Sequence, residues 1–108
     1  MTAPTVLVHR DPDELAAAVA ARLLTRLVDV QSARGEASLV LTGGGIARTV
    51  LEVVRDSPAR GAVDWSRLDV WWGDERFLPS GDAERNETLA RDALLDHVAL
   101  DAARVRPM

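Results

Sequence analysis

The sequence predicts an α/β fold, about half of a doubly wound, mostly parallel sheet with helices on both faces. Two apolar runs, residues 37–42 and 68–73, have the length and composition of strands, and a loop and a helical pattern follow each of them. Continuous apolar strands are typical of parallel sheets that are covered on both sides. Strands that alternate with helices along the chain favour the same class.

The first elements are predicted from local signals. Residues 5–8 (Thr-Val-Leu-Val) form a short apolar run that predicts a strand. A helix is expected to begin after Asp11, which suits the N-cap, because Pro follows at the first helical position and Glu14 completes a capping box. Leu, Val and Ala recur at four-residue spacing through this helix, and Gly35 is a natural stop. We interpret the helix as scaffold.

The second predicted strand, residues 37–42, leads into three glycines, Gly43, Gly44 and Gly45. Helical spacing resumes at once over residues 46–54, so the unit is strand, glycine turn, helix. Glycine backbone N–H groups and the free donors of a helix N-terminus bind phosphate well. The loop therefore indicates a phosphate site, with a tight turn that binds nothing as the alternative.

The same loop argues against a dinucleotide cofactor. Arg48 occupies the position of the third glycine in Gly-x-Gly-x-x-Gly, and no acidic residue closes a strand about twenty positions later. We expect no cofactor.

The third predicted strand, residues 68–73, follows a single turn at 64–67 and ends in three charged residues, Asp74, Glu75 and Arg76. Ligands of open α/β sheets lie just beyond the carboxyl ends of the strands. We interpret these charges as part of a site, and the alternative is a solvated turn.

One more helix is expected, from Glu84 or Asn86 to His97, and the polar residues 101–108 predict no element. His9 and His97 are far apart in the sequence and are predicted to be structural. No pair of residues has metal-ligand spacing on one element, so we expect no metal.

Composition excludes several classes of function. The 108 residues make at most one ordinary domain. The absence of cysteine excludes disulfides and thiol nucleophiles, and because all 13 basic residues are Arg, Schiff-base chemistry and Gly-Lys-Ser/Thr phosphate loops are excluded too. A net charge of −4 argues against a nucleic-acid partner. Without a signal sequence or an apolar run long enough to span a membrane, the expected location is the cytoplasm, with no membrane partner.

Two motifs stand together in this chain: Leu41-Thr-Gly-Gly-Gly-Ile-Ala47, and Trp72-Gly-Asp-Glu-Arg-Phe-Leu-Pro79 with Asn86 opening the next helix. The pair resembles the 6-phosphogluconolactonase family, within the superfamily that also holds glucosamine-6-phosphate deaminases. The resemblance implies a Rossmann-like sheet and hydrolysis of 6-phospho-D-glucono-1,5-lactone to 6-phosphogluconate in the pentose phosphate pathway. It covers the chain from Val6 onward but only about half of the family's length. Residues 1–108 are therefore expected to be the amino-terminal portion of a single sugar-phosphate-processing domain whose carboxyl-terminal half is absent.

The resemblance also implies roles for single residues. The substrate's phosphate would be held by the glycine loop and one arginine, namely Gly43, Gly44, Gly45 and Arg76. Backbone donors and a guanidinium are physically suited to that task. Asp74 matches a carboxylate that moves protons in the related deaminases, so a polar or proton-transfer role is expected. Glu75 and Asn86 are expected to support the loop.

Three departures from the family pattern matter. Arg85 stands where the family commonly has Ser, and Gly45 and Ile46 stand where it usually has Ser or Thr, which removes hydroxyl donors near the phosphate. The family's catalytic His lies in a Gly-His-Thr stretch of its second half, and neither His9 nor His97 matches it. Because lactone hydrolysis needs a general base, we expect the 108-residue chain alone to be inactive or weak.

Other interpretations remain open on these residues. One is an amino-sugar phosphate isomerase or deaminase of the same superfamily, and another is a remnant that binds a sugar phosphate without catalysis. Half of a doubly wound sheet would leave a central strand as an open edge, so we expect the isolated chain to be marginally stable or to self-associate.

Overall fold

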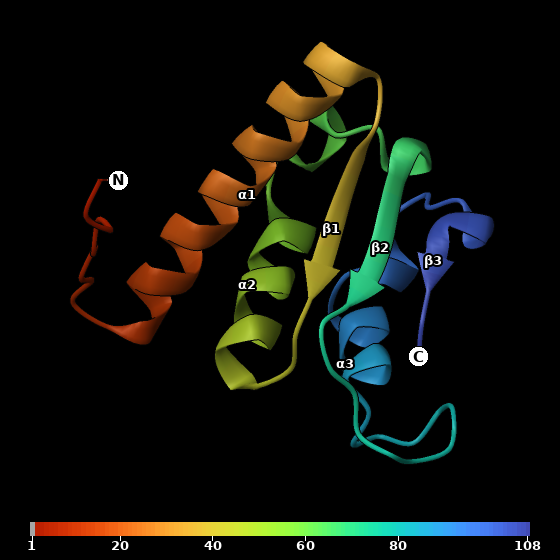
Figure 1. Ribbon diagram of the computed structural model, residues 1–108. Coiled ribbons are helices and arrows are strands. Elements are labelled where there is room, and N and C mark those ends of the chain that lie inside the picture. Colours follow the sequence, from red (N-terminus) through yellow and green to blue (C-terminus); the bar gives the residue numbers. More distant parts are fainter. Residues whose placement is uncertain (1) are drawn as a thin grey trace.

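The computed structural model describes residues 2–108, and Figure 1 shows three strands side by side in one sheet. The strands are β1 (Ala37–Leu41), β2 (Leu68–Trp72) and β3 (Val105–Arg106), in that order across the sheet, and both pairs are parallel. Ala37 lies opposite Leu68. The predicted α/β class with a parallel sheet is confirmed.

Three α-helices accompany the sheet: α1 (Pro12–Arg34), α2 (Gly45–Asp56) and α3 (Asn86–Ala93). Helix α1 begins and ends where the local signals predict. The Asp11 carboxylate accepts the backbone N–H of Glu14 at 2.8 Å, and Gly35 ends the helix in the left-handed region with φ 80°. The single turn before β2 is also present, as the 3₁₀ segment Trp65–Arg67.

The core lies between the helices and one face of the sheet. Alternate residues of β2, Leu68 and Val70, are fully buried there, together with Val54 of α2 and Leu94 after α3. Helix α1 packs mainly on α2, next to β1 (Figure 1). The helices thus hold β1 and β2 in place and leave their carboxyl ends free to carry loops.

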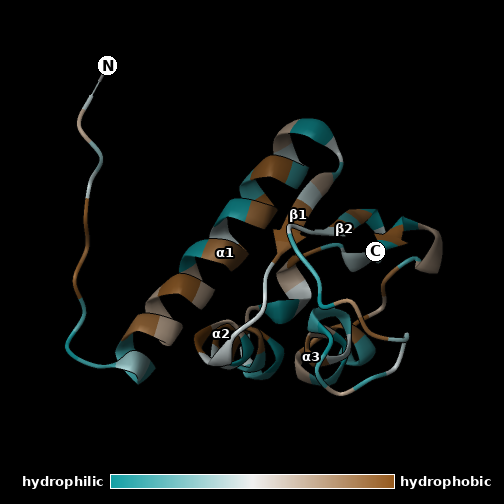
Figure 2. Cartoon of the chain, turned by 60° about the horizontal axis from the view of Figure 1, so that its bottom comes forward, coloured by the Kyte–Doolittle hydropathy of each residue, from teal (hydrophilic) through white to brown (hydrophobic). Residues whose placement is uncertain are grey.

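The other face of the sheet is open. Val40 of β1 lies beside Trp71 of β2, and the two are 64% and 44% exposed. The Arg106 guanidinium lies 4.6 Å from the centre of the Trp71 ring, a cation–π contact. Within residues 2–108, the helices α2 and α3 lie on the same side of the sheet (Figure 2).

Three expectations, about residues 5–8, the last helix and the carboxyl-terminal tail, were wrong. Residues 5–8 form no strand: the segment is extended and runs away from the helices (Figure 2), with Val6 78% and Val8 89% exposed, because no strand of the described chain pairs with it. The last helix ends at Ala93 and continues only as a 3₁₀ turn, Leu95–His97. The polar tail contains β3, which pairs with β2 and was not expected.

Candidate functional site

Two loops meet at the carboxyl ends of β1 and β2. The parallel pairing continues one residue past the strands, since the Gly73 N–H donates to the Leu41 carbonyl at 2.9 Å. The next residues then lie close together, and the Thr42 hydroxyl donates to Oδ1 of Asp74 at 3.3 Å. The glycine loop and the charged loop are therefore neighbours, as their places after adjacent parallel strands require.

Asn86, the first residue of α3, joins the two loops. Its side-chain Nδ2 donates to the Asp74 carbonyl at 3.2 Å and lies 3.5 Å from Asp74 Oδ1. On the glycine loop it lies against Gly43, where a Cβ atom would overlap Asn86 Oδ1 and come within 2.6 Å of Cγ. Gly43 is therefore needed for this close approach. The Asn86 side chain does not act as the N-cap of α3, a position that Arg85 occupies.

The rest of the glycine loop leaves the N-terminus of α2 open. Gly44 is the N-cap with φ 101°, a conformation that favours glycine, and no side chain caps the helix. Gly45 begins the helix, and at both glycines a Cβ would meet nothing within 4 Å. The first backbone N–H groups of α2 therefore face open space, together with the positive end of the helix dipole.

The Glu75 side chain binds the backbone at the start of α3. Its carboxylate accepts the backbone N–H groups of Arg76 at 2.8 Å, Asn86 at 2.6 Å and Glu87 at 2.9 Å, and the side chain is only 5% exposed. Burial raises the pKa of this carboxyl, but the three N–H donors and the nearby Arg85 guanidinium outweigh burial, and the pKa is lowered overall. Glu75 is therefore ionised and ties the charged loop to α3.

The structure adds Arg85 to the site, although the sequence predicted no structural role for this residue. Its side chain is 7% exposed and lies 2.8 Å from Glu87 and 3.6 Å from Glu75. It also donates to the backbone carbonyls of Leu78 at 3.2 Å and Met108 at 3.0 Å. The available signals were its place where the family commonly has Ser and the charge pattern of an Arg between Glu84 and Glu87, and neither indicates a buried ion cluster.

Arg76 is exposed, and its side chain forms no hydrogen bond or ion pair with residues 2–108. The structure therefore shows no hydrogen bond between the Arg76 guanidinium and the glycine loop within residues 2–108. Its backbone is fixed by the Glu75 carboxylate, and its side chain is free to meet a ligand.

The two histidines lie elsewhere. His9 lies 3.7 Å from Glu14 at the start of α1, and the His97 ring is hydrogen-bonded to the Asp92 carbonyl at 2.9 Å.

Across residues 2–108, no three potential metal-ligating side chains come together. In the same range, no helix combines the length and apolar character needed to cross a membrane.

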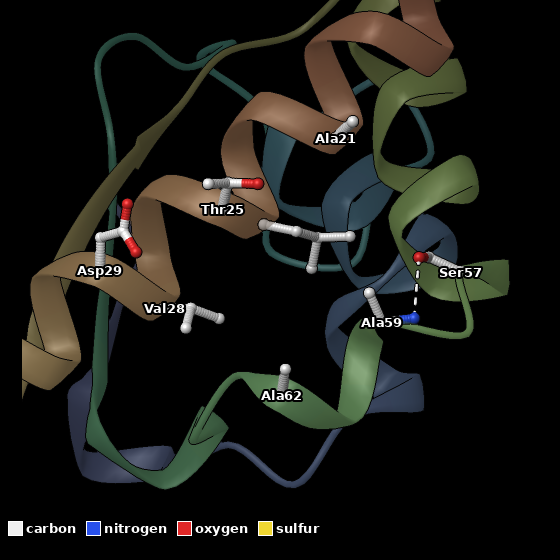
Figure 3. Close-up of a pocket in the computed structure, with 8 residues that line it drawn as sticks. Ala21, Thr25, Val28, Asp29, Ser57, Ala59 and Ala62 are labelled. Carbon is white, nitrogen blue, oxygen red and sulfur yellow. Dashed lines mark hydrogen bonds between the residues drawn. The ribbon is translucent and has the colours of Figure 1, made fainter.

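A separate pocket lies at the opposite end of α2, between α1 and the turn after α2 (Figure 3). Mostly apolar side chains line it, and the hydrogen bond drawn there joins the Ala59 N–H to the Ser57 hydroxyl at 3.1 Å. Its charged group is the carboxylate of Asp29, which would repel an anion. The pocket does not suit a phosphorylated ligand and is no part of the site.

The fold and the site define an α/β domain whose binding site lies at the carboxyl end of a parallel sheet, with an open helix N-terminus suited to an anion. Residues 10–108 match the model of the family described as glucosamine-6-phosphate isomerases/6-phosphogluconolactonase. The chain belongs to this family.

Among curated relatives, the chain is similar to the 6-phosphogluconolactonase of Streptomyces coelicolor, with 59% identity over 105 residues that cover 97% of this chain and 40% of that protein. It is 39% identical over 104 residues to the 6-phosphogluconolactonase of Mycobacterium tuberculosis, covering 96% of this chain and 41% of the relative. The solved structure of the Trypanosoma brucei 6-phosphogluconolactonase superimposes with a TM-score of 0.81 at 27% identity, over 97% of this chain and 39% of that one. The chain thus spans about 40% of the length of the curated relatives it matches.

Proposed function

We propose that this chain forms the substrate-holding part of a 6-phosphogluconolactonase, which hydrolyses 6-phospho-D-glucono-1,5-lactone to 6-phosphogluconate. The observation that carries the proposal is the junction of the two loops through Asn86, which contacts Asp74 on one side and Gly43 on the other. The junction brings a carboxylate next to an open helix N-terminus. The named function of the relatives supports the choice of substrate.

The phosphate is assigned to the N-terminus of α2. Uncapped N–H groups at Gly44 and Gly45 and the helix dipole favour an anion there. Arg76 would add a charge-assisted bond, because its guanidinium has no partner within residues 2–108. Gly45 supplies no hydroxyl, so the phosphate grip in this chain depends on backbone donors and the guanidinium.

Asp74 is assigned a polar or proton-transfer role. Thr42 and Asn86 both approach Oδ1, while Oδ2 accepts no hydrogen bond from residues 2–108. Oδ2 is therefore free to accept a hydrogen bond from a sugar hydroxyl or from a water molecule. Hydrolysis also requires a general base and stabilisation of the oxyanion, and we assign the base to the part of the relatives that lies beyond this chain.

Several narrower points form part of the same proposal. No cofactor is needed for the hydrolysis of a lactone by water. With a net charge of −4 we expect no nucleic-acid partner, and the proposed metabolic role places the protein in the cytoplasm. The open sheet face with Val40 and Trp71 supports the expectation that the isolated chain self-associates.

A chimera tests the function. In it, this chain replaces the matching part of the Streptomyces coelicolor relative, and lactone hydrolysis is followed by release of acid. We expect activity in the chimera, with kcat lowered about a hundredfold by Asp74→Asn and KM raised about tenfold by Arg76→Gln. The chain alone should bind 6-phosphogluconate in calorimetry with little or no turnover.

The outcomes separate the alternatives. A folded chimera that converts glucosamine 6-phosphate and not the lactone would favour the isomerase or deaminase. A folded chimera that binds 6-phosphogluconate without turnover of either substrate would favour the binding remnant. Clear hydrolysis by the 108-residue chain, abolished by Asp74→Ala, would make Asp74 the base and contradict the assignment of the base to another segment.

A further inference from the structure

A buried ion cluster lies behind the charged loop. It consists of the Arg85 guanidinium between two carboxylates, 2.8 Å from Glu87 and 3.6 Å from Glu75. The three side chains are 7%, 8% and 5% exposed, respectively. Two carboxylates this close in a site shielded from water repel each other unless a cation lies between them.

Arg85 is the cation on which Glu75 depends. Glu87 has a second partner, Arg91, at 2.9 Å, but that side chain is 39% exposed and has no contact with Glu75. In residues 2–108, Arg85 is the side-chain cation that forms an ion pair with Glu75. Its removal would leave Glu75 with backbone donors only.

Arg85 also fixes the loop itself. It donates to the Leu78 carbonyl, two residues after Arg76, and to the Met108 carbonyl beyond β3. The segment between β2 and α3 extends away from the rest of the chain (Figure 1), and Phe77 at its apolar centre is fully exposed. The bond from Arg85 to Leu78 therefore holds the loop next to its exposed part, whereas the Glu75 carboxylate holds the part that precedes it.

The chain of contacts continues into the site. Glu75 accepts the N–H of Arg76 and the N–H of Asn86, so it sets the position of both residues. Asn86 in turn contacts Asp74 and Gly43. A shift of Glu75 is therefore transmitted to Arg76 and, through Asn86, to Asp74 and Gly43.

We propose that Arg85 is a positioning residue: by holding Glu75 and the Leu78 carbonyl, it fixes Asn86 against Asp74 and sets the backbone from which Arg76 extends. The Arg85 guanidinium is already bound to Glu87 and to the Leu78 and Met108 carbonyls, so we assign it no contact with the substrate. The consequence for ligand affinity rests on the proposed function, whereas the consequence for Asn86 and Glu75 does not.

The test compares Arg85→Gln with Arg91→Gln in the 108-residue chain. Both variants remove one positive charge next to Glu87, but only Arg85→Gln also removes the ion-pair partner of Glu75. We expect Arg85→Gln to move the side-chain amide signals of Asn86 and the backbone signal of Gly43 in NMR spectra. We also expect the pKa of the Glu75 carboxyl to rise, because Arg85 is the cation paired with it and the nearby Glu87 carboxylate would then repel it. Arg91→Gln should leave these signals and that titration unchanged.

Ligand binding adds a second measurement. We expect Arg85→Gln to weaken binding of 6-phosphogluconate about tenfold, because a displaced Arg76 would lose its one charge-assisted contact with the phosphate. Arg85→Lys should restore the Glu75 titration, because it returns the charge, and restore affinity in part, because Lys lacks the planar fork that reaches two carbonyls.

A folded Arg85→Gln chain whose Asn86 signals and Glu75 titration match those of Arg91→Gln would overturn the proposal. If Arg85→Gln does not fold, Arg85→Lys decides: native Asn86 signals with a native Glu75 titration support the role of the charge, and displaced signals in a folded chain contradict it. Absence of 6-phosphogluconate binding by the unaltered chain would contradict the proposed function and leave the NMR test of Arg85 intact.

Discussion

Gly43→Ala should damage the site without touching its charges. The added Cβ would overlap Oδ1 of Asn86 and lie 2.6 Å from Cγ and 3.1 Å from Nδ2. Backbone φ at Gly43 is not in the left-handed region, so the substitution is incompatible through crowding and not through strain. The Asn86 amide must move, because Gly43 lies in a loop fixed by β1 and α2.

The energetic cost follows from the bonds that Asn86 makes. The residue is 5% exposed, and displacement breaks its contacts with the Asp74 carbonyl and Oδ1 at 3.2 and 3.5 Å. A buried amide that loses its partners costs about 1–3 kcal/mol. We expect Gly43→Ala to lower the free energy of unfolding by about 2 kcal/mol, which moves the urea midpoint down by about 1–2 M.

Gly45→Ala is the matched control. Gly45 is two residues away, lies in the first turn of α2, and a Cβ there meets nothing within 4 Å. Alanine in a helical position should be neutral or stabilise the fold by up to about 1 kcal/mol. Urea unfolding curves of both variants test the comparison. Equal midpoints for Gly43→Ala and Gly45→Ala would show that the Asn86 contact does not constrain this position.

Three further predictions concern the scaffold. Leu68→Ala empties a fully buried position on β2 and should cost about 2–5 kcal/mol in chemical denaturation, while a loss below about 1 kcal/mol would mean that the core does not close around this strand. Asp11→Ala removes the acceptor of the Glu14 N–H and should cost about 1 kcal/mol, visible as a lower thermal midpoint, whereas Asp11→Asn should retain most of it. Because the folded pKa of Glu75 is lowered, its contribution to stability should be complete above its ordinary value of 4.5 and be lost as the pH falls through the folded pKa; Glu75→Gln should flatten that part of the stability profile measured by urea unfolding.

Local signals determined those parts of the fold that depend on neighbours in the chain. The cap at Asp11 and the stop at Gly35 set both ends of α1, since each acts within one helical turn. The apolar runs set β1 and β2 to within one residue. The rule that ligands lie beyond the carboxyl ends of parallel strands predicted a site at Asp74 from the sequence alone.

Elements that depend on distant partners were not predictable in the same way. Residues 5–8 have the composition of a strand, but a strand requires a hydrogen-bonded neighbour, and residues 2–108 offer none to this segment. Val105 and Arg106 have little intrinsic signal and become β3 because the edge of β2 is available to them. Helix α3 stops at Ala93 although the apolar pattern continues, because Leu94 leaves helical geometry with φ −146° while remaining fully buried.

The site shows the same division. The sequence predicted a site at the glycines and at Asp74, Glu75 and Arg76 because each group directly follows a strand, and the family resemblance added Asn86 and the expected role of each residue. Only the tertiary structure decided that Gly43 must be glycine to admit Asn86 and that Arg85 is buried between Glu75 and Glu87. The physical reason is that close packing and charge burial depend on groups up to 43 positions apart, from Gly43 to Asn86, which meet only when the two loops fold onto the sheet.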